Sequence, residues 1–198
     1  MTEQTSTRGE RVAAILSFLD EANRLKDTLR SGRTPLGRRE STAEHSWRLC
    51  LLAILLGGEI EGVDLLKLVR LCIVHDLGEA ISGDVPAVEQ RPNDDRAARE
   101  RADLVTLCAP LPDDLAAMIL VLWDDYAEAR SPEAVIAKGL DKIETMLTHS
   151  TGRNEPGFDY AFNLGYARKA TDAHPLLAEI RQLIDDRHRA ILDRAAKA

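Results

Sequence analysis

The stretch VHDLGEAISGD, residues 74–84, places a histidine, two aspartates and a glutamate directly after the mostly apolar run LLKLVRLCI of residues 65–73. A segment that is apolar on nearly every side is typical of a helix in the middle of a domain. Burying polar groups without partners costs about 2–7 kcal/mol for a neutral group and more for a charge. The stretch therefore indicates a central helix whose charged end either reaches solvent or has partners that offset this cost.

Helical patterns also cover most of the remaining chain. Apolar residues in the segment 15–29 recur at the spacing of one helix face. Ser41 and Glu44 form a capping box, and Ser131 followed by Pro132 is typical of a helix start. The patterns predict helices over residues 15–29, 41–56, 64–76, 94–108, 113–129, 131–147, 158–171 and 175–192, and glycines and a proline predict a loop over 31–40.

Length and composition favour one helical domain. The 198 residues suit a single domain with a substantial core. Aromatic residues make up only 4% and β-branched runs are scarce, so the composition favours helices over strands. We expect an all-α, single-domain helical bundle over residues 1–198, with a core at about 13–150 and C-terminal helices at about 158–192.

Charge, hydropathy and cysteine usage limit the possible partners and compartment. The net charge of -7 argues against a general binder of nucleic-acid polymers or of anionic membranes. No run reaches the roughly 18–20 apolar residues of a membrane span, and the N-terminus lacks the pattern of a secretory signal. The three cysteines are widely spaced and odd in number, which is typical of reduced thiols. We expect a cytoplasmic protein with no membrane and no nucleic-acid partner.

Four polar side chains fall at apolar positions of the predicted helices. His45 shares a helix face with three leucines, and His75 and Asp76 end the most apolar helix. Asp141 lies between the core-like residues Leu140 and Ile143. Taken singly, each has a simpler interpretation, a hydrogen-bonded core histidine or a salt-bridged acid. Together, two imidazoles and two carboxylates can satisfy one another around a divalent cation, which offsets their desolvation.

The order of these four residues resembles the H…HD…D signature of the HD-domain metal-dependent phosphohydrolases. The stretches STAEHSWR, VHDLGEAISGD and KGLDKIE are similar to those that hold the signature, and the resemblance extends over residues 13–190. It is closest to the small HD-domain 5'-deoxynucleotidases. An HD dipeptide alone is a weak signal, but four elements in order within helices are specific.

The resemblance implies an HD-type helical bundle, commonly a homodimer, that cleaves (deoxy)nucleoside 5'-monophosphates to nucleoside and inorganic phosphate. It implies that His45, His75, Asp76 and Asp141 bind one divalent ion, for which we expect Mn, Co, Fe, Ni, Zn or Mg. Two-metal HD enzymes have extra histidines between the HD pair and the last aspartate, and this chain has none there. His149, His174 and His188 follow later, where we expect helix ends or the surface.

Two further acids in the opening stretch are candidate catalytic residues. Glu79 lies four residues after His75 and would share its face if the helix continued. The resemblance implies that Glu79 assists the attacking water and that Asp84 lines the site. A carboxylate beside a metal-activated water can take its proton. The alternatives are a supporting or surface acid for Glu79 and a helix cap for Asp84.

A phosphate ester also needs a cation from the protein. The segment SGRTPLGRRE, residues 31–40, offers Arg33, Arg38 and Arg39 just before the helix of His45. The resemblance places the phosphate-binding arginine at Arg33, and a guanidinium can bind two phosphate oxygens at once. Thr34 follows, where the bacterial deoxynucleotidase has a tryptophan. The alternative is a solvated basic loop.

Two rival functions share these residues. One is a phosphohydrolase of another nucleotide or small phosphate ester, and the other is a non-catalytic regulatory module that binds metal. The presence of Glu79 together with all four predicted ligands favours an enzyme. The tryptophans, Trp47 and Trp123, are expected to pack in the core.

Overall fold

The computed structural model describes residues 7–89 and 95–197. The described part is helical except for one short hairpin, so the prediction of an all-α single domain is confirmed. The α-helices are α1 Arg8–Ala22, α2 Thr42–Leu56, α3 Leu65–Val74, α4 Glu79–Ser82, α5 Arg96–Cys108, α6 Asp113–Glu128, α7 Pro132–Thr151, α8 Tyr160–Gly165, α9 Arg168–Thr171 and α10 Pro175–Ala195. Short 3-10 turns are η1 Asn23–Lys26, η2 Gly57–Glu59 and η3 Ala87–Glu89, and the strands are β1 Leu29–Arg33 and β2 Arg39–Ser41.

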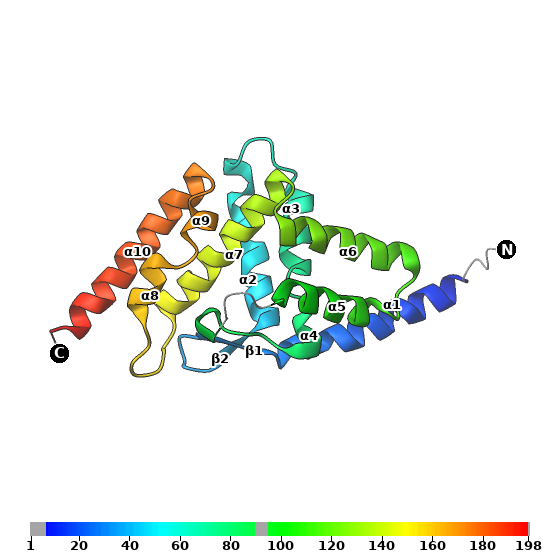
Figure 1. Cartoon of the computed structure of the whole chain (residues 1–198), viewed down its shortest axis with the longest axis horizontal. Coiled ribbons are helices and arrows are strands. Elements are labelled where there is room, and N and C mark those ends of the chain that lie inside the picture. The colour runs from blue at the N-terminus through cyan, green and yellow to red at the C-terminus, as the bar shows by residue number, and fades with distance from the viewer. Residues whose placement is uncertain (1–6, 90–94, 198) are drawn as a thin grey trace.

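Helix α7 lies in the middle of the molecule, with α8, α9 and α10 on one side and α1, α5 and α6 on the other (Figure 1). It packs against α2, α3, α6, α9 and α10, and its residues are buried at intervals along its whole length. The main core joins α7 to α2, α3 and α10 through Leu49, Leu68, Leu71, Leu140, Ile143, Met146 and Leu177. A second core joins α1 to α3, α5 and α6.

Gly139 allows the close packing around α7. A Cβ atom at this position would lie 2.9 Å from the carbonyl oxygen of Ala170 and would overlap the side chain of Leu177. Any larger residue would therefore push α9 and α10 away from α7. The central helix can hold the C-terminal helices this tightly because it has no side chain here.

The structure differs from the predicted elements at three places. The helix predicted over 15–29 is α1 at Arg8–Ala22, followed by η1 and by β1, which begins at Leu29. The predicted loop over 31–40 is an antiparallel hairpin in which Leu29 pairs with Ser41 and Arg33 with Arg39. The predicted helix over 158–171 is two short helices, separated by Ala167 in the left-handed conformation with φ 54°. No helix in the described ranges is both long and apolar enough to cross a membrane.

Candidate metal and substrate site

His45 lies in the first turn of α2, where its position is set by the start of the helix. Ser41 and Glu44 form the predicted capping box, with the Glu44 backbone N–H donating to Ser41 Oγ at 3.3 Å. The His45 side chain is fully buried on the face of α2 that carries Leu49 and Ala53. The imidazole therefore points into the core beside α7.

His75 and Asp76 follow the last residue of α3, where the backbone leaves the helix. His75 Nδ1 lies 2.9 Å from the carbonyl oxygen of Cys72, and the indole N–H of Trp123 donates to the carbonyl oxygen of His75 at 3.1 Å. Because a carbonyl only accepts, His75 carries its proton on Nδ1 and presents the Nε2 lone pair. The turn lets these adjacent side chains face the same site, which a regular helix would not allow.

The structure brings the four predicted ligands together. Asp141 Oδ1 lies 3.3 Å from His45 Nε2 and 3.8 Å from His75 Nε2. Asp76 Oδ2 lies 3.0 Å from His75 Nε2 and 3.8 Å from His45 Nε2. The donor atoms of His45, His75 and Asp76 all lie within 4.8 Å of one another. These four residues, called the ligand cluster below, come from α2, the end of α3 and α7 and thus meet at one point.

The donor set fits a divalent cation. His45 Nε2 and His75 Nε2 are buried, and neither has a hydrogen-bond partner in the described part of the chain. Burial and the charge of Arg30 lower the pKa of His45, whereas Glu144 and Asp141 raise it more, to about 9. The surroundings of His45 therefore favour a positive charge, and a bound cation can supply that charge in place of the proton.

Supporting side chains orient the predicted ligands. The Tyr126 hydroxyl donates to Asp141 Oδ2 at 2.8 Å, and Lys142 Nζ lies 2.8 Å from the same oxygen. This leaves Asp141 Oδ1 for the imidazoles. Burial raises the pKa of Asp141, but Lys142 and the two histidines lower it by more than burial raises it. The pKa therefore lies well below its usual range. Asp141 is therefore an anion in this site.

Glu144, one turn after Asp141 on α7, orients His45. It makes a short contact with His45 Nδ1 and accepts a hydrogen bond from Arg48 Nε at 2.6 Å. A carboxylate on the far nitrogen of a metal-binding histidine fixes the ring and its tautomer. Sequence reasoning missed Glu144, although its position four residues before Thr148 and three after Asp141 places all three near one face of α7.

Glu79 begins α4 and is buried close to the ligand cluster. Thr42 Oγ1 donates to Glu79 Oε2 at 2.9 Å. Burial, and then the charge of Asp76, raise the pKa of Glu79 to about 9. A carboxyl group with a raised pKa beside a charged cleft can exchange a proton with a reacting group.

Arg30 reaches the site, and sequence reasoning missed it; Arg96 also lines the cavity described below. Its side chain, only 12% exposed, donates from Nη1 to Asp76 Oδ2 at 3.1 Å, and Asp84 Oδ1 lies 3.9 Å from the same nitrogen. Arg30 Nη2 donates to Thr145 Oγ1 at 3.3 Å. Gly32 lets β1 approach α7, because a Cβ there would lie 2.7 Å from Thr148 Cγ2.

The predicted arginine, Arg33, has other partners. It forms an ion pair with Glu155 and donates to the carbonyl oxygen of Gly37 at 2.6 Å, and it does not line the cavity described below. Arg38 pairs with Glu44, and Arg39 donates to the carbonyl oxygens of Arg30 and Leu29. Ser31 follows Arg30 and also lines the cavity. If Arg30 is the phosphate-binding arginine, the residue after that arginine is therefore Ser31 and not Thr34.

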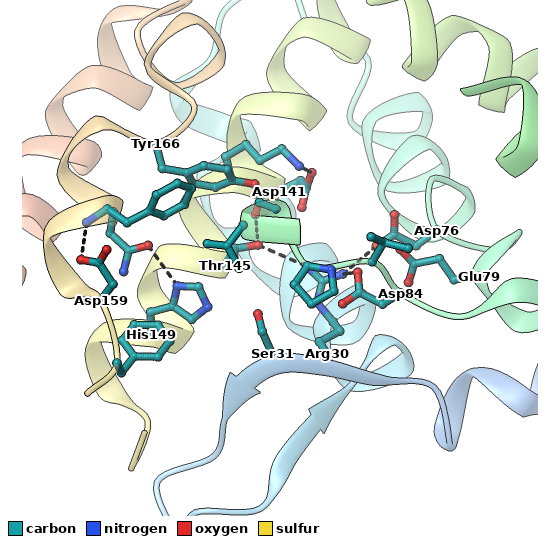
Figure 2. Close-up of a pocket in the computed structure, with 18 of the residues that line it drawn as sticks. Arg30, Ser31, Asp76, Glu79, Asp84, Asp141, Thr145, His149, Asp159 and Tyr166 are labelled. Carbon is teal, nitrogen blue, oxygen red and sulfur yellow. Dashed lines mark hydrogen bonds and ion pairs between the residues drawn. The ribbon is translucent and has the colours of Figure 1, made fainter. Parts of the chain in front are cut away.

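One continuous cavity extends from the ligand cluster to a wall of aromatic side chains. Figure 2 shows Arg30, Asp76, Glu79 and Asp84 at one end, with His149, Asp159 and Tyr166 at the other. Asp141 and Thr145 lie between the two ends. The aromatic end also includes Phe158, Phe162 and Asn163. The cavity thus combines a charged end with an end that suits a planar apolar group.

A second cavity reaches the same cluster. It is lined by His75, Asp76 and Asp141 together with four cationic side chains, Arg96, Lys138, Lys142 and Lys169. The lining also carries four carboxylates, those of Asp76, Glu100, Glu128 and Asp141, so its positive and negative charges balance.

The expectations for His188 and Trp47 need correction, whereas His149 and His174 lie at helix ends as expected. His149 lies in the last turn of α7 and His188 within α10, but both are buried, because each packs around Asn163. His174 is at a helix end as expected, where its ring accepts from the Leu176 N–H. Trp123 is in the core, whereas Trp47 is 65% exposed because it faces outward from α2.

Known proteins are similar to this chain over most of its length. A family model described as HD domain matches residues 22–181. The 5'-deoxynucleotidase HDDC2 of Bos taurus is 32% identical over 186 residues, 91% of this chain and 86% of that protein. The same enzyme of Mus musculus is 30% identical, over 88% of this chain and 86% of its own. A crystal structure of a predicted metal-dependent phosphohydrolase from Magnetospirillum magnetotacticum is 31% identical with a TM-score of 0.72, covering 91% of this chain and 96% of that one.

Proposed function

The chain belongs to the HD domain family, and from that membership we propose that it is a metal-dependent phosphohydrolase of (deoxy)nucleoside 5'-monophosphates. The products are a nucleoside and inorganic phosphate. One observation carries the proposal: two buried imidazole Nε2 atoms without hydrogen-bond partners among the described residues face two aspartates at the charged end of a cavity. The other end of that cavity can hold the organic part of the substrate.

We propose that His45, His75, Asp76 and Asp141 hold one divalent ion. Mixed imidazole and carboxylate donors suit Mn, Co, Fe, Ni or Zn, and carboxylates also suit Mg. When bound, the ion supplies Lewis acidity toward the phosphoryl group and lowers the pKa of water. Another group of possible ligands, Glu40, His45 and Glu144, shares His45 with the first, and its Glu144 is bonded to Arg48. These contacts favour a single ion.

The residues around the cluster take the remaining roles. In its ionised form, which the positive charge of a bound ion would favour, Glu79 accepts a proton from the attacking water and holds it beside Thr42. Arg30 binds the phosphoryl oxygens, because it lines the charged end of the cavity, donates directly to Asp76, and has a fork that can bind two oxygens at once. Asp84, close to Arg30 Nη1, helps to keep the guanidinium in place. Arg30 thus replaces Arg33 in the proposal.

Replacing Arg30 with alanine is expected to lower kcat/KM by about 10²–10³-fold, the usual cost of removing one group that stabilises developing charge. Arg33→Ala is the matched control, since it removes the same charge three residues away, and it should change kcat/KM by less than about threefold. Release of inorganic phosphate from a nucleoside monophosphate measures both. A larger loss in the Arg33 variant than in the Arg30 variant would restore Arg33 as the phosphate-binding residue.

The activity itself is tested with a panel of deoxy- and ribonucleoside 5'-monophosphates, each assayed with Mn, Co and Mg. We expect phosphate release that depends on the divalent ion and stops with a chelator. Absence of turnover on every monophosphate, with metal demonstrably bound, would favour the rival interpretations: a different phosphate ester or a regulatory module.

We also propose a homodimer in the cytoplasm. Helix α2 exposes an apolar stripe of Trp47, Leu51, Ile54 and Leu55, with Leu55 69% exposed, and such a stripe suits a symmetric contact. Cys50, Cys72 and Cys108 are free thiols, as expected in a reducing compartment. Light scattering should give twice the chain mass of 21.9 kDa, and a monomer at micromolar concentration would contradict the dimer.

A further inference from the structure

One face of α7 runs along the cavity from its charged end to its aromatic end. Asp141, Thr145 and His149 all line the cavity at intervals of four residues. A helix rises 1.5 Å per residue, so about 12 Å of axis separate the first from the last. A ligand whose phosphate lies near Asp141 would therefore place its far end near His149.

The far end is a wall of aromatic side chains that the protein core does not cover. Phe162 is 39% exposed although it lines the cavity, and its ring lies 5.4 Å from that of Tyr166 with an interplanar angle of 31°. Phe158 packs against His149 with the ring centroids 4.9 Å apart. Aromatic faces of this kind bind planar heterocycles by stacking.

His149 adds a polar group of defined character to this wall. Its Nδ1 lies 3.2 Å from Asn163 Oδ1, which only accepts, so the proton is on Nδ1 and Nε2 is an acceptor. Asn163 Nδ2 in turn lies 3.4 Å from His188 Nε2. Burial also lowers the pKa of His149 to about 4, so the ring is neutral at physiological pH.

Helix α10 supports the backbone that carries these aromatic side chains. Arg181 is fully buried, pairs with Asp185 at 2.8 Å, and donates to the carbonyl oxygens of Asn163, Leu164 and Tyr166. These carbonyls lie at the C-terminal end of α8, where a helix has too few backbone N–H groups for its last carbonyls. The aromatic residues of α8 are therefore positioned before a ligand arrives, which lowers the entropic cost of binding.

We infer that this aromatic end, formed by Phe158, Phe162 and Tyr166 with His149, is the site that binds the nucleobase of the substrate. The inference rests on the proposed function. The base stacks on the exposed ring of Phe162, and an N–H group on its edge donates to His149 Nε2. Since each common nucleobase has such a donor, the site recognises the base as a class.

The test compares a nucleotide with a substrate that lacks the base. Phe162→Ala should lower kcat/KM for deoxyadenosine 5'-monophosphate by about tenfold or more, the effect expected when one stacking partner is removed. It should leave kcat/KM for 2-deoxyribose 5-phosphate within about twofold. Leu183→Ala is the control, because it truncates another exposed apolar side chain, on α10 and away from the cavity. An equal loss on both substrates, or no loss on either, would overturn the inference.

A binding measurement separates this inference from the proposed activity. Titration calorimetry with deoxyadenosine, which has no phosphate, should show weaker binding to Phe162→Ala than to the wild type and to Leu183→Ala. If no monophosphate is hydrolysed but this difference is found, the proposed function fails and the base site stands. If the nucleoside binds all three proteins equally, or binds none of them, the base site is wrong whatever the activity.

Discussion

Replacing Asp141 with alanine is expected to remove both the bound metal and the hydrolytic activity. Asp141 Oδ1 is the oxygen nearest to His45 Nε2, and Tyr126 and Lys142 already engage the other oxygen. Without it, the two imidazoles keep only Asp76 as an acidic neighbour among the predicted ligands. Loss of an ion that stabilises the transition state by several kcal/mol corresponds to at least about 10³-fold in rate.

The measurement has two parts. Metal content of the purified protein, by elemental analysis, should fall from about one ion per chain to a small fraction, and phosphate release should become undetectable. Asp114→Ala is the matched control, since it removes an exposed aspartate that pairs only with Arg11 among the described contacts. Circular dichroism establishes that both variants fold. A fully loaded Asp141 variant would show that this residue is not a ligand.

Changing Glu79 to glutamine is expected to spare the metal and lower kcat by about 10²–10⁴-fold, the usual contribution of a general base. Glutamine keeps the size of the side chain and an oxygen for the hydrogen bond from Thr42, so the local packing stays intact. It cannot accept a proton from water. Burial and Asp76 raise the pKa of Glu79, which makes its carboxylate a stronger base, and a bound ion would favour the ionised carboxylate before the reaction.

Single-turnover kinetics and metal content distinguish this outcome from simple damage to the site. Glu89→Gln is the control, because it makes the same chemical change at an exposed position in η3. Metal content should be equal in the wild type and both variants, with the rate reduced in the Glu79 variant alone. Full activity of Glu79→Gln would remove this residue from the mechanism.

The helices and the ligand cluster follow from local signals in the sequence. Capping residues and helical periodicity predict α2 and α7, and they place His45 and Asp141 on buried faces. A polar side chain at an apolar position needs a partner, and this physical requirement links residues that are far apart in the chain. The cluster could therefore be predicted from four positions without knowing the packing of the helices.

Arg30 could not be found in this way. Its strand has five residues and pairs with a strand of three, so periodicity carries almost no signal, and Leu29 completes a helical pattern that in fact ends at Ala22. Tertiary pairing with β2 overrides that pattern. The aromatic wall was missed for a related reason, since Phe158, Phe162 and Tyr166 have the spacing of a core-facing helix, and only the structure places them along a cavity.

Because one unbroken helix carries Asp141 and His149, the length of the ligand that fits is set by the backbone of α7. Substitutions at either end can alter the chemistry there without moving the other end. An insertion or deletion of one residue between them would rotate everything beyond it by about 100° around the helix axis. We therefore expect relatives with new substrates to differ from this chain in the identity of these side chains, while the eight-residue interval stays constant.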